Sequence, residues 1–400
     1  MKKKEIRNQI YSVGVLNPTL RTFDVFMRTE YGTTYNVYIV KGENKTALIE
    51  SVNREGFDEF FENLKEVINP AEIDYIILNH TEPDHSGSLA KILEYAPNAV
   101  VVATATALRF LKNIVNQDFP SLTATEDLVL DLGKRSLHFK IAPNLHWPDS
   151  MFTYLPEEKM IFTCDFLGAH YCESPLELSK IYKPNLYEGA FRFYYDCIFS
   201  PFKKFVLAGL NKMDGLDIEF LAPSHGPALD SKAAIEKAKS LYREWSTEKD
   251  PGHTATIVYV SAYGYTKKLA LEIAEELKKE DFKVSLFDLS SDDFAKAAEA
   301  ALSSKLLFIG SSTINRNALP TIWNFLTGLD AIALAGKPVG VFGSYGWSGE
   351  AVPALKAYLT QMRCKVVGEG FKAVFQPSET ELSQVKEYAK TAIESIKKPV

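Results

Sequence analysis

The loop at residues 79–87, Asn-His-Thr-Glu-Pro-Asp-His-Ser-Gly, constrains the fold of this 400-residue chain more than any other stretch. It follows an apolar, β-branched run at 73–78 that is typical of a buried strand. The loop carries two imidazoles and two carboxylates, those of His80, Glu82, Asp84 and His85. Pro83 stiffens its middle, and we expect Ser86 to cap the helix that follows. A solvated turn seldom gathers so many ligand groups, so the loop predicts a metal site.

Three further candidate ligands stand where apolar strands stop. His146 follows the run at 139–143, Asp165 follows 160–164, and His225 follows 220–224. A sheet that brings its polar groups to one edge builds a site at that edge. The seven side chains are therefore expected to converge.

The pattern of the first 250 residues predicts a four-layer αββα sandwich, with strands meandering in both halves and helices outside. Strands are predicted at 10–15, 35–40, 45–50, 73–78, 99–103, 128–132, 136–141, 151–155 and 159–163. Helices are predicted at 57–68, 88–95, 105–115 and 231–245. A polar stretch at 246–253 closes this domain, which we place at 1–250.

The second domain, placed at 254–400, has a different pattern. Strands at 255–260, 283–287, 305–309, 338–342 and 364–367 alternate with amphipathic helices. This alternation predicts a doubly wound parallel sheet of five strands, as in flavodoxins.

Three loops at the carboxyl ends of these strands predict an FMN site. The loop at 261–266 offers hydroxyls and N–H groups at a helix N-terminus and lacks a Walker A lysine, so a monophosphate fits better than ATP. Small residues in the loops at 310–317 and 343–349 let the backbone approach a flat ring, and Tyr345 or Trp347 can stack on it. The residues expected to contact FMN are Ser261, Ala262, Tyr263, Gly264, Tyr265, Thr266, Ser311, Thr313, Ile314, Asn315, Asn317, Ser344, Tyr345, Gly346, Trp347 and Gly349.

Composition excludes several function classes. The net charge of -6, without a basic stripe, argues against nucleic acid as a partner. No secretory h-region follows the basic start, and no apolar stretch is long enough to cross a bilayer, so we expect a cytoplasmic protein. The four cysteines form no C-x-x-C pair, which argues against an iron-sulfur cluster or a built-in rubredoxin domain.

The loop and its three followers resemble the metallo-β-lactamase superfamily, whose usual motif is H-x-H-x-D-H. The chain departs from that motif at Glu82, where a zinc hydrolase would have its second His. With the flavodoxin-like half, nearly the whole chain is similar to the flavodiiron proteins, also called A-type flavoproteins. The resemblance implies two iron ions. His80, Glu82 and His146 would hold one iron, Asp84, His85 and His225 the other, and Asp165 would bridge them.

The ligand charge agrees with this departure. Four neutral imidazoles and three carboxylates leave a pair of divalent ions with little net positive charge, and carboxylates favour the harder, oxidised ion. Zinc has no redox chemistry and would suit a site richer in imidazole. Glu82 therefore moves the prediction from hydrolysis towards electron transfer.

The resemblance implies an oxidoreductase that reduces O2 to water or NO to N2O, with FMN relaying electrons from an external donor such as rubredoxin or a reduced deazaflavin. It also implies a head-to-tail homodimer or a dimer of dimers. Two alternatives stay open: a di-zinc hydrolase fused to a flavodoxin electron carrier, and a plain electron carrier with structural metals.

Four residues near the predicted site stay unassigned. Asp24 stands roughly where some members of the family have a second-sphere His, and His170 follows Asp165 by five residues. Tyr194 and Tyr195 are equal candidates for a tyrosine that lies near the metals in the family. The sequence does not separate O2 from NO as substrate.

Overall fold

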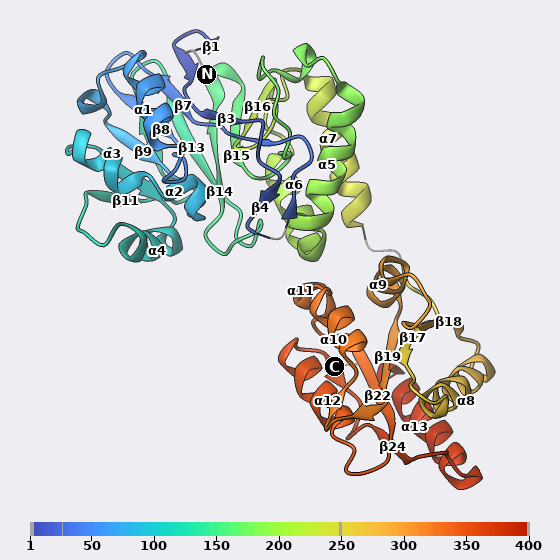
Figure 1. The fold of residues 1–400 in the computed structure, drawn as a ribbon. Coiled ribbons are helices and arrows are strands. Elements are labelled where there is room, and N and C mark those ends of the chain that lie inside the picture. The colour runs from blue at the N-terminus through green and yellow to red at the C-terminus, as the bar shows by residue number, and fades with distance from the viewer. Residues whose placement is uncertain (1–3, 26, 248–249, 398–400) are drawn as a thin grey trace. The chain divides into compact units, whose positions relative to one another are not determined.

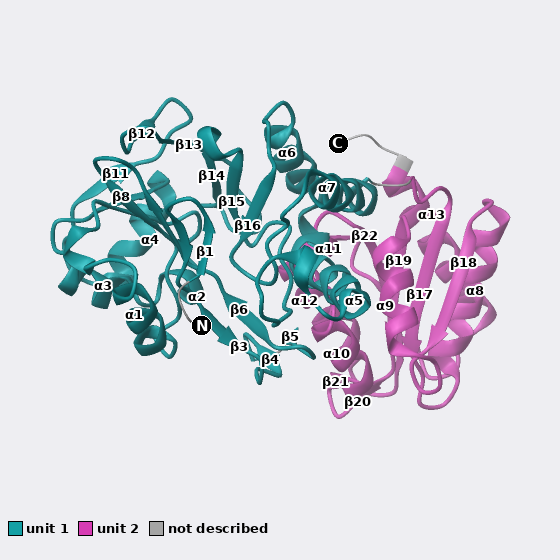
Figure 2. Cartoon of the chain, turned by 90° about the horizontal axis from the view of Figure 1, so that it is seen from above, with its two compact units in different colours: residues 1–248 teal, residues 249–400 magenta. Residues whose placement is uncertain are grey.

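The computed structural model describes residues 4–25, 27–247 and 250–397. The chain forms two compact units, residues 1–248 and 249–400 (Figure 2). The two domains predicted from the sequence are 1–250 and 254–400. Among the described residues, no helix is long and apolar enough to cross a membrane.

Unit 1 contains two main sheets (Figure 1). In spatial order, the seven-stranded sheet consists of β1 (Lys4–Arg7), β2 (Ile10–Ser12), β7 (Tyr38–Lys41), β8 (Thr46–Ile49), β9 (Tyr75–Ile77), β10 (Val100–Ala103) and β11 (Ser121–Thr123). The five-stranded sheet consists of β12 (Val129–Asp131), β13 (Ser136–Ile141), β14 (Met151–Leu155), β15 (Met160–Cys164) and β16 (Phe220–Pro223). Two hairpin-like pairs lie beside them: β3 (Val15–Asn17) with β6 (Thr33–Tyr35), and β4 (Thr22–Phe23) with β5 (Met27–Arg28).

The two sheets pack face to face through one apolar core. Tyr38 and Ile77 of the first sheet share this core with Phe139 and Phe162 of the second, and all four are nearly inaccessible to solvent. Removing such apolar surface from water is the main force that holds the layers together.

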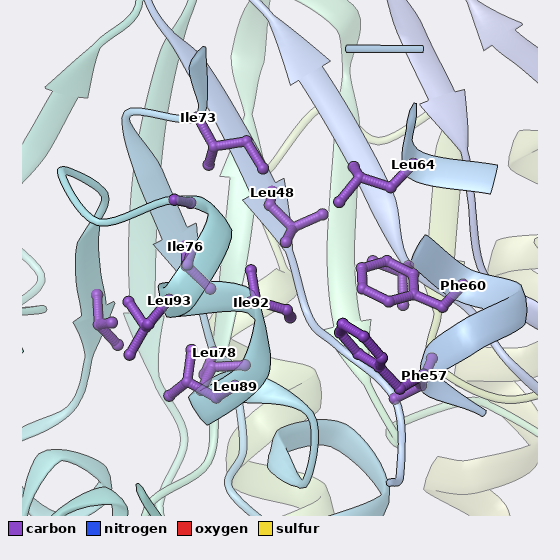
Figure 3. Close-up of a cluster of buried hydrophobic side chains, with 14 of the residues drawn as sticks. Leu48, Phe57, Phe60, Leu64, Ile73, Ile76, Leu78, Leu89, Ile92 and Leu93 are labelled. Atoms are coloured by element: carbon purple, nitrogen blue, oxygen red, sulfur yellow. The ribbon is translucent and has the colours of Figure 1, made fainter. Parts of the chain in front are cut away.

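Helices cover the outer face of each sheet. The first sheet carries α1 (Phe57–Lys65), α3 (Leu89–Tyr95) and α4 (Ala105–Val115), and Figure 3 shows Phe60 of α1 and Ile92 of α3 pointing towards Leu48 of the sheet. The second sheet carries α5 (Pro184–Tyr194), α6 (Lys203–Met213) and α7 (Lys232–Ser246), packed through a separate core. The predicted αββα sandwich is confirmed.

Unit 2 is a doubly wound α/β fold around a parallel sheet. The sheet has the order β18 (Lys283–Asp288), β17 (Thr254–Val260), β19 (Leu306–Ser311), β22 (Pro338–Tyr345), β23 (Lys365–Val366), and β24 (Phe371–Val374) also pairs with β22. Its helices are α8 (Tyr265–Lys279), α9 (Phe294–Ser303), α10 (Pro320–Thr327), α11 (Ala331–Leu334), α12 (Ala351–Gln361) and α13 (Glu379–Lys397), with a small hairpin of β20 (Thr313–Ile314) and β21 (Asn317–Ala318). Helices α8 and α13 cover one face of the sheet, and α9, α10 and α12 cover the other.

The structure differs from the five predicted strands of this sheet by one. Strands β23 and β24 both lie along β22, one after the other, so the fifth strand position is occupied by two short strands. Gly368 and Gly370 between them have φ of +55° and +81°, a region that interrupts an extended strand and that glycine adopts without strain.

The ligand loop also differs from the prediction. It contains a single helical turn, α2 (Pro83–Ser86), with Pro83 at the first position, where its missing N–H costs nothing. Ser86 does not cap the next helix, because its hydroxyl donates to the carbonyl of Thr81 within the loop at 2.8 Å. Helix α3 starts after Ser88 instead. The turn places Asp84 and His85 on a rigid element.

Candidate functional site

The seven predicted ligands come together at one edge of unit 1. The loop after β9 supplies four of them, and the loop between β13 and β14 supplies His146. Asp165 and His225 follow the neighbouring parallel strands β15 and β16, where Cys164 pairs with Pro223, so both side chains leave the sheet at the same end. Each is at most partly exposed, and Glu82, the most open, has a side chain exposed by 15%.

Glu82, His80 and His146 form the first group of ligand atoms with one oxygen of Asp165. Oε2 of Glu82 lies 3.2 Å from Nε2 of His80 and 3.2 Å from Nε2 of His146. Oδ2 of Asp165 lies 3.7 and 3.4 Å from the same two nitrogens. The four atoms converge on one point, as the ligands of one metal ion do.

Asp84, His85 and His225 form the second group. Oδ2 of Asp84 lies 3.3 Å from Nε2 of His85 and 3.0 Å from Nε2 of His225. The other oxygen of Asp165, Oδ1, lies 3.0 and 3.4 Å from these nitrogens. One carboxylate therefore faces both groups, with one oxygen towards each.

Several of these buried atoms lack a hydrogen-bond partner. Among the described residues, both oxygens of Asp84, Nε2 of His85 and Oδ1 of Asp165 are buried and unpartnered. A buried polar atom without a partner costs about 1–3 kcal/mol, and a charged one costs more. Cations between the two groups would satisfy all four atoms, so the residues present fit a pair of metal ions.

The charges of the cluster depend strongly on one another. Burial by itself would raise the pKa of Asp165, but the nearby imidazoles of His85 and His146 hold that pKa well below its ordinary value. Burial would likewise lower the pKa of His85, yet Asp84 and Asp165 raise it to about 10. Burial also opposes the rise at His80, whose pKa lies well above its ordinary value because of Asp149 and Glu82. The imidazoles therefore favour their protonated form, and their positive charge balances the negative charge of the carboxylates.

Two groups that the sequence analysis missed orient the ligand imidazoles. Oδ1 of Asp149 lies 3.2 Å from Nδ1 of His80, and its other oxygen accepts the backbone N–H of Thr81 at 2.9 Å. The carbonyl of Thr34 lies 2.6 Å from Nδ1 of His225. Both contacts leave Nε2 free to bind a metal. Asp149 follows His146 by three residues in the same loop, so the sequence offers a signal for it. The backbone carbonyl of Thr34 offers no such signal, because every residue has one.

A buried acid lies behind His85. Glu50 is 1% exposed, accepts two hydrogen bonds from Asn79 through Oε1, and burial raises its pKa to about 7. Its carboxylate, an imidazole nitrogen of His85 and the thiol of Cys164 lie within 4.8 Å of one another. Cys164 has a φ of +52°, which ends the extended strand β15 at that residue.

Asp24 and His170 both lie near the cluster. Burial and the charges of Glu82 and Asp84 raise the pKa of Asp24 to about 6. Asp24 and Asp84 both line a cavity of about 810 Å³. The ring of His170 lies 4.9 Å from that of His225, and burial lowers its pKa well below the ordinary value.

The structure distinguishes the two candidate tyrosines. The ring of Tyr194 lies 4.8 Å from that of His170 and 6.3 Å from that of His225. Tyr195 faces away, with its hydroxyl 2.8 Å from that of Ser246 on α7. Tyr194 is therefore the tyrosine next to the cluster.

Unit 2 has a pocket of about 330 Å³ at the carboxyl ends of its strands. Ten of the residues predicted to contact FMN line it: Ala262, Tyr263, Tyr265, Thr313, Ile314, Asn315, Ser344, Tyr345, Gly346 and Trp347. Ser312, Arg316, Glu350 and Phe375 also line it and were missed. Tyr263 and Trp347 are 81% and 84% exposed at its rim, which leaves their faces free to stack on a flat ring.

The other predicted contacts shape the loops of this pocket. The hydroxyl of Thr266 lies 3.0 Å from that of Ser312 and 2.8 Å from that of Ser344, so it joins all three loops. Ser261 accepts the N–H of Lys267, and Gly264 has a φ of +82° just before α8. The oxygens of Ser311 and Asn317 bond to Leu319 N–H and Trp323 Nε1–H. Gly349 has a φ of +72° against the ring of Tyr345.

Comparison with known proteins agrees with both units. A family model described as ODP family beta lactamase matches residues 33–226, and a flavodoxin model matches residues 257–388. The chain is 45% identical over 398 residues to the flavo-diiron protein FprA2 of Clostridium acetobutylicum, covering 98% of this chain and 99% of the relative. The chain belongs to the flavo-diiron protein family.

Further relatives extend this assignment. The type A flavoprotein fprA of Rhodobacter capsulatus is 36% identical over 382 residues, covering 94% of this chain and 87% of the relative. Among solved structures, rubredoxin oxygen:oxidoreductase from Desulfovibrio gigas matches with a TM-score of 0.72 and 28% identity over 99% of both chains. The flavodiiron protein of Giardia intestinalis matches with a TM-score of 0.69 and 28% identity over 99% and 98% of the two chains. The flavodoxin domain of this flavo-diiron protein implies FMN as its cofactor.

Proposed function

We propose that this flavo-diiron protein reduces O2 to water or NO to N2O at a pair of iron ions, with FMN in unit 2 relaying electrons from an external donor. The observation that carries the proposal is the arrangement of seven side chains in two groups that share Asp165. His80, Glu82 and His146 would hold one iron, and Asp84, His85 and His225 the other. When bound, FMN can carry two electrons and each iron one, which matches the four electrons that O2 needs to become water.

The donor set favours iron over zinc. Glu82 adds a third carboxylate to Asp84 and Asp165, and carboxylates stabilise the higher oxidation state of a redox-active ion. Zinc has no second oxidation state to stabilise. The di-zinc hydrolase of the sequence analysis therefore has less support than the reductase.

A residue of the chain is also placed to supply protons that the reaction consumes. Asp24 borders the same cavity of about 810 Å³ as Asp84, and with a pKa of about 6 its carboxyl group exchanges a proton near neutral pH. A group with a pKa near the working pH is well suited to proton transfer. Asp24 would thus hold a proton beside Glu82. After giving up that proton, it would take another from solvent in the cavity.

The external donor and the assembly belong to the proposal as well. The four cysteines form no C-x-x-C pair, so an external donor is expected to supply the electrons. Rubredoxin is a candidate donor because the matched Desulfovibrio gigas protein bears rubredoxin in its name; a reduced deazaflavin is another. A head-to-tail homodimer or dimer of dimers would bring FMN of one subunit to the iron pair of the next. The cytoplasmic location stays a prediction.

An anaerobic mixing experiment tests the proposal. The purified protein, loaded with FMN and iron and fully reduced, is mixed in parallel with O2 and with NO. Rapid flavin reoxidation by O2 without peroxide identifies an oxygen reductase, and rapid formation of N2O identifies a nitric oxide reductase. The control is protein that keeps FMN but has lost its metal to a chelator. If the metal-loaded protein is no faster than this control with either gas, the proposal is wrong.

A further inference from the structure

A buried hydrogen-bonded pair, Thr33 and His170, lies behind the ligand His225. Thr33 is on β6 and His170 follows β15, and both side chains are buried. The hydroxyl oxygen of Thr33 lies 2.8 Å from Nδ1 of His170 and 3.3 Å from Nδ1 of His225. It also lies 3.3 Å from the carbonyl oxygen of Thr34. Among the hydrogen bonds of the described residues, His225 is the only candidate ligand whose ring nitrogen lies next to a side-chain hydroxyl.

Donor and acceptor roles follow from the carbonyl of Thr34. A carbonyl can only accept, and at 2.6 Å from Nδ1 of His225 it requires a proton on that nitrogen. The Thr33 hydroxyl therefore cannot donate to His225. Its single proton goes to His170 or to the Thr34 carbonyl, and Nδ1 of His170 is nearer by half an ångström.

We propose that His170 is a positioning residue for the metal ligand His225, acting through Thr33. By accepting the Thr33 proton, His170 turns a lone pair of the hydroxyl oxygen towards the Nδ1–H of His225. It also leaves the Thr34 carbonyl to His225. Two acceptors then polarise one N–H bond, which makes Nε2 a stronger donor to the ion held with Asp84 and His85. This inference rests on the proposed function, since it needs an ion at that position.

The surroundings of His170 are compatible with the tautomer that this requires. If Nδ1 accepts, the ring proton is on Nε2, which has no hydrogen-bond partner among the described residues. His170 also lines a cavity of about 360 Å³ with Arg28 and Tyr194, which is large enough for solvent to reach the ring. The ring packs between Phe23, at 4.3 Å, and Tyr194, at 4.8 Å, so its orientation is fixed.

The inference predicts a change at one of the two metal positions only. Losing a group that orients a metal ligand typically weakens metal binding 10–100-fold. In Thr33→Val, which keeps the shape and removes the hydroxyl, we expect one of two metal equivalents to bind at least about tenfold more weakly. The reduction potential of one iron should rise, because a weaker donor stabilises the oxidised ion less. The other iron and FMN should keep their potentials.

Matched variants isolate the hydrogen bond from packing. Thr33→Ser keeps the hydroxyl and should behave as wild type. His170→Asn places an amide oxygen near the position of Nδ1 and should retain function, whereas His170→Gln places its amide further out and should resemble Thr33→Val. Because both residues act through one hydrogen bond, the double variant Thr33→Val with His170→Gln should be no worse than either single variant.

The test uses the full chain loaded with FMN and iron. Metal affinity is measured by competition with a chelator, and potentials by redox titration followed by electron paramagnetic resonance. Wild-type affinity and potentials in Thr33→Val or in His170→Gln, with two irons bound, would overturn the inference and leave the proposed function standing. A wild-type chain that binds no pair of iron ions would overturn both.

Discussion

Nε2 of His85 lies 3.0 Å from Oδ1 of Asp165, while Oδ2 of the same carboxylate points to the other group of ligands. His85 is on the one-turn helix after β9, and Asp165 directly follows β15, so the contact joins the edges of the two sheets of unit 1. Each sheet thus contributes candidate ligands to both groups. A bound pair of metal ions should therefore hold the edges of the two sheets together.

Replacing the shared carboxylate tests whether Asp165 binds both metal ions. Asp165→Asn removes one negative charge and one ligand oxygen, so each ion loses affinity, by an expected ten- to hundredfold or more. Iron per chain should fall from about two to below one, while FMN per chain stays constant because unit 2 is untouched. Asp127→Asn, at an exposed position, is the control. An Asp165→Asn protein that retains two tightly bound ions would show that Asp165 does not bridge.

Glu82 determines the choice of metal in this account. Glu82→His replaces a carboxylate by a fifth imidazole, which lowers the preference for oxidised iron and favours zinc. Protein prepared with equal supplies of both metals should show a lower ratio of iron to zinc than wild type, measured by elemental analysis. Full iron content and full reductase activity in Glu82→His would refute the charge argument.

Metal binding should release protons. In the metal-free site the pKa of His85 is about 10, and the pKa values of His80 and His146 are raised as well, so these imidazoles favour the protonated form. A metal binds only the deprotonated ring, so protons should leave when the metals bind, and affinity should fall as the pH is lowered from 8 to 6. Calorimetric titration with Zn²⁺ in two buffers of different ionisation enthalpy counts these protons. A count of zero would contradict the assigned protonation states.

The Thr266 hydroxyl should matter for FMN because it joins three loops of the pocket. Thr266→Val leaves the hydroxyls of Ser312 and Ser344 without this partner, which costs about 1 kcal/mol, or roughly a fivefold rise in the Kd of FMN. Fluorescence titration of the flavin-free protein measures the Kd. Thr360→Val, on the exposed side of α12, is the matched control and should leave it unchanged. An equal Kd in both variants would mean that the three loops do not depend on this contact.

The sequence predicted best where one local signal was strong. The helix expected at 105–115 is α4 at Ala105–Val115, because Thr104 caps its start and Asn116 ends it in the left-handed region. The strands expected at 136–141 and 151–155 are β13 and β14 with the same limits. The seven candidate ligands converge because each lies at the end of a strand or in the segment that follows one, and apolar periodicity marks those strand ends clearly.

Contacts made through space explain the failures. The Thr34 carbonyl lies 191 residues from His225 in the sequence, so no local pattern reports this contact. The bond between Asp149 and His80 spans 69 residues, and its only local signal is the place of Asp149 three residues after His146. Strand β24 was missed because it has only four residues after two glycines, and only Ala373 among them is buried, which gives a weak periodic signal. Arg316 and Phe375 reach the pocket of unit 2 from loops, whose paths depend on the packing of both neighbouring elements.

The number of electrons that leave the reduced protein tests the central claim most directly. Anaerobically reduced protein, loaded with FMN and iron, is titrated with limiting O2 or NO while flavin absorbance, iron oxidation state and peroxide are recorded. The account predicts four electrons per chain, two from FMN and one from each iron, with no peroxide formed from O2. Delivery of only two electrons, with peroxide as the product whether or not the metals are present, would contradict it.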